Sequence, residues 1–174
     1  RVMKRQAPLL ALLLLAGCGP AAPKVRYLPE RIVSVAVPTF SNQTVVPGLE
    51  EKLTTRTIEE YLRDGRVRVV PENQADAVLR GVVTRYSLEP LSYHASGANA
   101  GAVSEYSLRI RVDLTLRERA GGQDLWTVRD LEEETRYGTE SGFVSTEDQA
   151  RARVREYLAR AAVKQTVEGP YTRK

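Results

Sequence analysis

The chain has 174 residues, with 26 Lys and Arg against 22 Asp and Glu, and 42% of its residues are hydrophobic. This ordinary composition excludes collagen-like, coiled-coil and intrinsically disordered proteins, and it predicts one domain with one core. Because the chain has one Cys and one His, it cannot form a disulfide scaffold or close a structural zinc site, and no metal is expected.

Residues 1–17 have the features of a secretory signal peptide. A cationic start with Arg1, Lys4 and Arg5 precedes an apolar run that is too short to span a bilayer permanently. The run ends in Leu15-Ala16-Gly17-Cys18, which matches the lipobox of bacterial lipoproteins, where the peptide is cut before the Cys and the Cys is lipidated. We therefore expect the mature chain to begin at a lipidated Cys18 and to be anchored by its acyl chains.

Removal of residues 1–17 takes away three positive charges and no negative one, which leaves the rest of the chain almost neutral. Binding to phosphates of nucleic acid needs a net-basic stripe, so no nucleic-acid partner is expected. Gly19 follows the Cys at the position where enteric bacteria use Asp to retain lipoproteins in the inner membrane. The sequence therefore favours the outer membrane.

Residues 18–30 join the lipidated Cys to the domain. They contain Pro20, Pro23 and Pro29 among small residues, a composition typical of a semi-extended tether. We expect the domain to cover residues 31–168 and a frayed tail to follow over residues 169–174.

The first part of the domain predicts a strand, a helix and a second strand. Residues 31–37 are β-branched and apolar on both faces, as in a covered strand. After Pro47, apolar residues recur every four positions until Gly65, which predicts an amphipathic helix with a glycine C-cap. Residues 67–70 predict a short strand, and this order predicts a right-handed parallel crossover.

The middle of the domain predicts a β-hairpin preceded by another strand. Residues 73–77 read as a turn and residues 78–88 as a strand. Residues 105–119 alternate between apolar even positions and polar odd positions, the period of a strand with one buried face. Residues 120–124 predict a hairpin turn, and residues 125–137 return as a strand that becomes acidic in its second half.

The last predicted element is a helix that Ser145 or Thr146 can cap. Its apolar stripe consists of Ala150, Val154, Tyr157, Leu158, Ala161 and Ala162. The order β-α-β-β-β-β-α, with both helices apolar along one stripe, predicts an α+β fold. We expect the two helices to pack on one face of a four- to five-stranded mixed sheet.

The other face of this sheet is expected to carry arginines. Arg109 and Arg111 occupy odd positions of the alternating strand, and the neighbouring strands supply Arg85 and Arg129. Two interpretations stay open for this face. It is either an ordinary solvated face or an anion site, in which guanidinium groups bind a phosphorylated ligand or an acidic partner.

Few residues suggest an enzyme. His94 lies beside a loop of small residues, and the chain lacks a Gly-x-Ser-x-Gly elbow and a phosphate-binding glycine loop. Glu132, Glu133 and Glu134 could supply two carboxylates, but adjacent strand residues point to opposite faces, so a solvated charge run is the better interpretation. We therefore expect no catalysis and no cofactor other than the covalent lipid.

Several segments, taken in order, resemble the LptE (RlpB) family of lipopolysaccharide-assembly lipoproteins. The matching segments are residues 35–44, 47–50, 58–62, 64–70, 75–81, 88–93 and 122–126. The resemblance implies an outer-membrane lipoprotein that sits inside the β-barrel protein LptD, on the periplasmic side, and binds lipopolysaccharide through basic residues. Residues 95–102 are small and are expected to form either a flexible hairpin loop that could order against the interior of the barrel or a disordered loop.

An alternative interpretation is that the chain is an envelope lipoprotein of similar fold with a different function. The Phe40-x-Asn42 signal, and a helix before a short valine-rich strand, also occur in curli-secretion-channel lipoproteins and in activators of cell-wall synthases. A channel needs long hairpins with an apolar lipid face, and residues 127–136 are too acidic to pair with residues 105–116 in lipid. All these relatives are non-catalytic.

Overall fold

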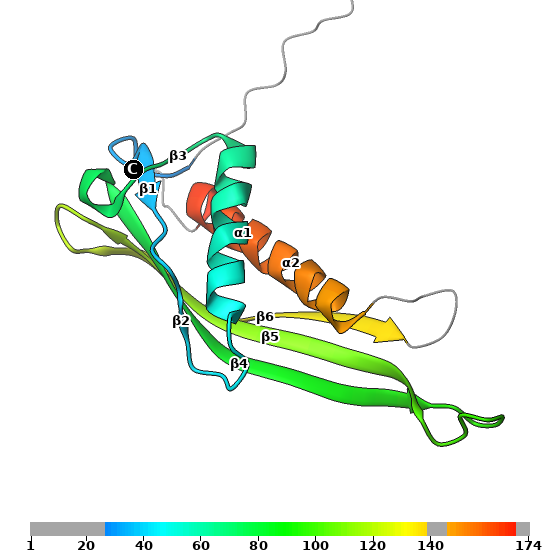
Figure 1. The fold of residues 1–174 in the computed structure, drawn as a ribbon. Helices are drawn as coiled ribbons and strands as arrows, with labels where there is room; N and C mark the ends of the chain where they lie inside the picture. Colours follow the sequence, from blue (N-terminus) through cyan, green and yellow to red (C-terminus); the bar gives the residue numbers. More distant parts are fainter. Residues whose placement is uncertain (1–26, 139–145, 170–174) are drawn as a thin grey trace, which may run out of the picture.

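A computed structural model describes residues 27–138 and 146–169 as two helices over one mixed sheet (Figure 1). The elements, in chain order, are β1 (Ser34–Ala36), β2 (Ser41–Asn42), α1 (Leu49–Asp64), β3 (Arg68–Val69), the 3-10 turn η1 (Glu72–Gln74), β4 (Ala77–Tyr93), β5 (Val103–Glu118), β6 (Asp124–Gly138) and α2 (Glu147–Glu168). Cys18 and the signal peptide lie outside the described residues.

The sheet has six strands in the order β3-β1-β4-β5-β6, with β2 paired to β4. β1 pairs in parallel with both β3 and β4, so the predicted parallel strand-helix-strand unit is confirmed. β4 pairs with β5, and β5 with β6, in antiparallel fashion. The hairpin predicted for residues 105–119 and 125–137 is the pair of β5 and β6. The α+β class with a mixed sheet is confirmed, and the short β2 brings the number of strands to six.

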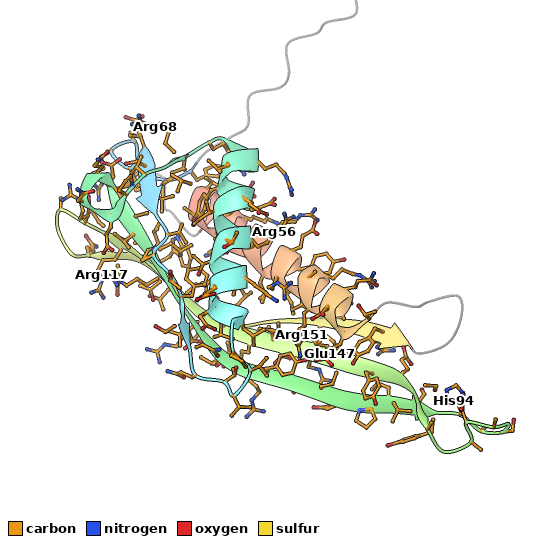
Figure 2. The ribbon with its side chains drawn as sticks, in the orientation of Figure 1. Arg56, Arg68, His94, Arg117, Glu147 and Arg151 are labelled. Carbon is orange, nitrogen blue, oxygen red and sulfur yellow. The ribbon has the colours of Figure 1, made fainter. Side chains whose placement is uncertain are left out.

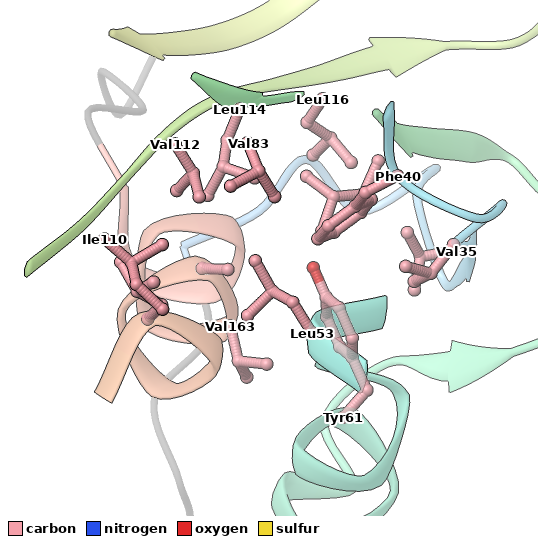
Figure 3. Close-up of a cluster of buried hydrophobic side chains, with 14 of the residues drawn as sticks. Val35, Phe40, Leu53, Tyr61, Val83, Ile110, Val112, Leu114, Leu116 and Val163 are labelled. Carbon is pink, nitrogen blue, oxygen red and sulfur yellow. The ribbon is translucent and has the colours of Figure 1, made fainter. Parts of the chain in front are cut away.

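Both helices cover the same face of the sheet, and the core lies between them and β4 and β5 (Figures 1 and 3). The even positions of β5 form the sheet side of this core: Leu108, Ile110, Val112, Leu114 and Leu116 are all buried. α2 adds Ala150, Val154, Leu158 and Ala162, as predicted. Tyr157, which the predicted stripe included, is instead 43% exposed, because the buried stripe extends round the helix toward Ala159 and Val163, away from Tyr157.

Local signals in the sequence define both helices. Gly65 closes α1 with a φ of 74°, and its N–H donates to the Tyr61 carbonyl. Thr146 caps α2 in a reciprocal capping box with Gln149. The Tyr61 and Thr166 hydroxyls meet at 2.5 Å and join the two helices near their C-terminal ends. Neither described helix is long and apolar enough to cross a bilayer.

The folded part begins earlier than predicted. The Tyr27 N–H donates to the Val167 carbonyl at 2.8 Å, and Leu28 is buried in the core. Residues 27–30 are therefore part of the domain and not of the tether. The apolar side chain of Leu28 explains why, because burying it stabilises the domain by about 1.5–3 kcal/mol.

The side chains of three residues fix the conformation of the segment between β1 and α1. Phe40 is buried, and its ring lies directly over Gly81 of β4. The Asn42 amide donates to the Val46 carbonyl and to the Glu50 carboxylate, and its oxygen accepts from the Thr44 N–H at 2.9 Å. This explains physically why Phe-x-Asn precedes the helix: the Phe packs on the sheet and the Asn organises the loop.

Asp76 fastens β1 to the start of β4. Its Oδ2 accepts from the Val33 and Ser34 N–H groups and from the Ser34 hydroxyl, at 2.7–3.0 Å. The Ser34 hydroxyl, with the two backbone N–H groups, lowers the pKa of Asp76 against the opposing effect of burial. Since the folded pKa is below the unfolded one, the carboxylate stabilises the fold above about pH 4, and the effect disappears as the pH falls through the folded pKa.

We therefore expect Asp76→Ala to lower the free energy of unfolding at pH 7 by about 1–3 kcal/mol, because three donors lose their acceptor. Urea unfolding at pH 7 and at pH 3 measures the effect, which should shrink at the lower pH, where the wild-type carboxyl is also becoming protonated. An equal loss at both pH values would contradict the role of the ionised carboxylate.

Candidate anion-binding face and distal arm

The face of the sheet opposite the helices carries charges of both signs. The odd positions of β5 point to it, and their cross-strand partners on β4 and β6 share it. Its arginines are Arg80, Arg85, Arg109, Arg111, Arg117 and Arg136. Its acidic residues are Glu89, Glu105, Asp113, Asp124, Glu132 and Glu134. The predicted arginine face therefore exists, but a matching set of carboxylates lies on it.

Arg109 and Arg111 both pair with carboxylates of β6. The Arg109 Nε donates to Glu134 at 2.9 Å, and the Arg111 Nη2 donates to Glu132 at 2.8 Å. Hydrogen bonds from Arg109, and then from the Ser107 hydroxyl, lower the pKa of Glu134. These two guanidinium groups are held in fixed positions, with part of their charge neutralised within the sheet.

Arg85 and Arg129 have no ion-pair or hydrogen-bond partner within the described parts of the chain. Arg85 lies directly across from Arg111, just after a register shift at Thr84 in β4. Arg129 is exposed in a bulge of β6, next to Asp130, whose φ is 54° and whose N–H donates to Asp113. The structure thus brings Arg85, Arg109 and Arg111 together on one face and places Arg129 at its edge.

β4 and β5 continue beyond the helices as an arm, here called the distal arm, which comprises residues 87–107 (Figure 1). β4 reaches Tyr93, five residues further than the predicted strand end at Leu88. Residues 90–104 contain no Asp, Glu, Lys or Arg, in a chain that is 28% charged. Leu91 and Tyr93 are 40% and 58% exposed near the tip, so the end of the arm is uncharged and partly apolar.

The tip of the distal arm is a hairpin loop, as predicted for residues 95–102. The His94 N–H donates to the Ala102 carbonyl, and the Gly101 N–H donates back to the His94 carbonyl, both at 2.9 Å. Figure 2 shows His94 at this end of the molecule, far from Glu147 and Arg151.

β4 is fastened to the start of α2 by a polar cluster just before the distal arm begins (Figure 2). The Tyr86 hydroxyl donates to Glu147 at 2.6 Å and accepts from the Arg151 Nε at 3.2 Å. Arg151 also pairs with Glu147 and lies over the Tyr86 ring, 5.3 Å from its centroid. Burial, followed by the bond to Glu147, raises the pKa of Tyr86 to about 12, so it stays protonated and donates at neutral pH.

Replacing Tyr86 with Phe is expected to lower the free energy of unfolding by about 1 kcal/mol and to loosen the first turns of α2. Amide hydrogen exchange gives the most local measurement, because protection should fall in residues 147–151 and not in α1. The control is Tyr93→Phe, whose side chain is exposed at the arm. Equal protection in Tyr86→Phe and wild type would show that the cluster does not hold α2 to β4.

The acidic run does not form a catalytic pair. Glu132 and Glu134 lie on the open face and bind arginines, whereas Glu133 pairs across from Ile110 on the helix side. In the described ranges no cluster of three or more His, Cys, Asp or Glu could hold a metal ion. The acidic partners of the arginines were missed as site residues, although their i, i+2 spacing in a strand opposite Arg109 and Arg111 could have indicated them.

The model of one protein family, LptE, described as lipopolysaccharide-assembly, matches residues 32–168. A search of curated proteins gives no match.

Solved structures with a similar fold are themselves bacterial proteins, two of them named as lipoproteins. Lipoprotein B from Nitrosomonas europaea is 15% identical, with a TM-score of 0.54 over 86% of this chain and 91% of that chain. The PelC dodecamer from Paraburkholderia phytofirmans is 17% identical, with a TM-score of 0.50 over 86% and 96%. A minor lipoprotein from Acinetobacter baumannii is 21% identical, with a TM-score of 0.47 over 82% and 98%. At such identities, the first two show the fold alone.

Proposed function

Since the chain belongs to the LptE family of lipopolysaccharide-assembly proteins, we propose that it is a lipid-anchored, non-catalytic factor of the outer membrane. In this role it partners an LptD-type β-barrel and binds lipopolysaccharide. The observation that carries the proposal is the family match, which covers almost the whole described domain. The lipobox at Cys18, just before the tether, agrees with attachment to the periplasmic face of a membrane.

The arginine side chains of the open sheet face bind the phosphate groups of lipopolysaccharide in this proposal. Arg85 has no carboxylate partner within the described residues and is the cross-strand neighbour of Arg111, so both arginines belong to the same part of the open face. Their planar forks suit phosphate, which they can bind in bidentate fashion. Arg109 is the next arginine along β5 on the same face, held by Glu134. Arg129 extends the surface at the edge of β6.

The distal arm supplies a second contact, with the barrel. Its tip carries no charged side chain over residues 90–104, and Leu91 and Tyr93 are exposed there. A narrow hairpin without Asp, Glu, Lys or Arg can enter the interior of another protein at a lower desolvation cost than a charged one, because its polar groups are the backbone, the hydroxyls, the Asn99 amide and the His94 imidazole. We propose that the loop of residues 95–102 contacts the interior of the barrel.

A titration of purified mature protein with purified lipopolysaccharide tests the binding part of the proposal. Saturable binding that weakens with added salt is expected, because the contact is between arginines and phosphates. The absence of binding at low ionic strength would contradict a lipopolysaccharide site on this chain.

Cys18→Ala is expected to move the protein from the membrane fraction to the soluble periplasmic fraction, while the domain stays folded. Each buried methylene of an acyl chain contributes about 0.8 kcal/mol of membrane affinity, and removal of the thiol removes the attachment point. Fractionation with immunodetection measures the change. The control is Gly19→Ala, which keeps the thiol. Retention of the Cys18→Ala protein in the membrane fraction would show another means of attachment.

A further inference from the structure

The N-terminal halves of α1 and α2 enclose a groove on the outer side of the helical layer. The two helices meet near their C-terminal ends and diverge toward their N-terminal ends (Figure 1). The groove has a volume of about 530 Å³. Its lining residues are Glu51, Lys52, Thr55, Arg56, Glu59, Ala152, Arg155 and Glu156. This groove lies away from the open sheet face and from the distal arm.

Arg155 is a half-buried guanidinium of this groove that forms no ion pair with the part of the chain that the structure describes. Its side chain is half-buried, yet nothing in the described residues forms a hydrogen bond or an ion pair with it. Burial, and after it the neighbouring Arg151, lower the pKa of Arg155. By contrast, Arg56 on the facing helix pairs with Glu59 and Glu156, at 3.0 and 3.5 Å. Asp148 opposes this lowering of the Arg155 pKa without forming an ion pair with it, so the partly desolvated guanidinium is open to an anion from outside the chain.

The chemistry of the groove indicates which anion fits. The lining carries three acidic side chains, Glu51, Glu59 and Glu156, against the basic side chains of Lys52, Arg56 and Arg155, so it offers no excess of positive charge to a doubly charged phosphate. A single carboxylate can pair with the Arg155 guanidinium in bidentate fashion, and a neighbouring basic group of the same ligand can pair with Glu51, which has no ion pair within the described residues. Thr55 and Ala152, which are small, leave room for side chains between the helices. This pattern matches a peptide segment that carries both acidic and basic residues.

We propose that the α1–α2 groove is a docking site for a segment of a partner protein, with an Asp or Glu of that segment bound to Arg155. The site is independent of the proposed function, because it involves neither the arginines of the sheet face nor the arm. A failure of lipopolysaccharide binding would therefore leave it in place.

The test places a photo-crosslinking side chain at Ala152 in the full-length protein in its native membranes. Irradiation should give a protein adduct whose crosslinked peptide, mapped by mass spectrometry, contains an Asp or Glu. The yield should fall about tenfold in Arg155→Glu and stay unchanged in Arg153→Glu, an exposed arginine without an ion-pair partner in the described ranges. Reversing the mapped acidic residue to Lys should restore the adduct of Arg155→Glu.

Three results would overturn the proposal: no adduct, an adduct with lipid or with a second copy of this chain only, or an adduct that persists in Arg155→Glu. Thermal unfolding of the purified protein gives a second measurement. Arg155→Met should raise Tm by about 2–4 °C, because it removes an uncompensated charge and keeps the apolar stem. A lower Tm would show that Arg155 has a structural role and no docking role.

Discussion

Reversal of Arg85 and Arg129 together is expected to weaken lipopolysaccharide binding by at least about tenfold without unfolding the protein. Each hydrogen bond to a charged group contributes about 1.5–3 kcal/mol, and each 1.4 kcal/mol is a factor of ten in affinity. Neither arginine has an ion pair within the described chain, so Arg85→Glu with Arg129→Glu disrupts no internal contact. Isothermal titration with purified lipopolysaccharide measures the affinity.

The matched control is Arg153→Glu with Lys164→Glu, which changes the net charge equally at two other exposed basic residues without ion-pair partners in the described residues. Its affinity should stay within about twofold of wild type, since long-range effects of surface charge are screened by salt. Equal losses in both double variants would mean that net charge alone governs binding. Reversing Arg109 and Arg111 instead would place carboxylates against Glu134 and Glu132 and so disturb the sheet as well.

Gly81→Ala is expected to lower the free energy of unfolding by about 2–3 kcal/mol, because the added methyl group overpacks the core. A Cβ at this position would lie 2.7 Å from the Cγ of the buried Phe40 ring. Phe40 cannot move away easily, because its N–H donates to the Thr54 hydroxyl and its ring packs in the core. Urea unfolding of the mature domain measures the loss.

The contact between Phe40 and Gly81 can be isolated by a double-mutant cycle. In a Phe40→Leu background, Gly81→Ala should cost less than about 1 kcal/mol, because the shorter side chain leaves room for the added methyl group. Gly121→Ala, in the hairpin turn and 3.7 Å from its nearest neighbour, serves as the control with little effect. Additive losses in the cycle would contradict the explanation by direct contact.

The elements that follow from periodicity are confirmed, and those that depend on pairing are not predictable from the sequence. The alternation in residues 105–119 predicts β5, and the four-residue spacing before Gly65 predicts α1. β2 consists of Ser41 and Asn42, which have no strand signal of their own and are held by pairing with Val82 and Val83 of β4. Tyr157 belongs to the apolar spacing of α2 but is 43% exposed, because the buried stripe extends round the helix toward Ala159 and Val163.

The arginines of the sheet face were predicted, but their electrostatic environment was not. Which carboxylate faces which guanidinium depends on register, and a shift of one residue moves every side chain to the other face. Here bulges at Thr84 and at Asp130 change the register within β4 and β6. These bulges leave Arg85 without a partner while Arg111 has two, Glu132 and Asp130. Likewise, the absence of an ion pair at Arg155 among the described residues depends on the arrangement of α1 and α2, which the sequence does not reveal.

The central claim is that this chain works with an LptD-type barrel in lipopolysaccharide assembly. The most direct test is affinity purification of the tagged, lipidated protein from native outer membranes, followed by mass spectrometry and quantification of the protein that accompanies it. We expect a large β-barrel protein of the LptD type at about one copy per copy of this chain. Recovery of a ring of this chain alone, or of a cell-wall synthase, would contradict the claim.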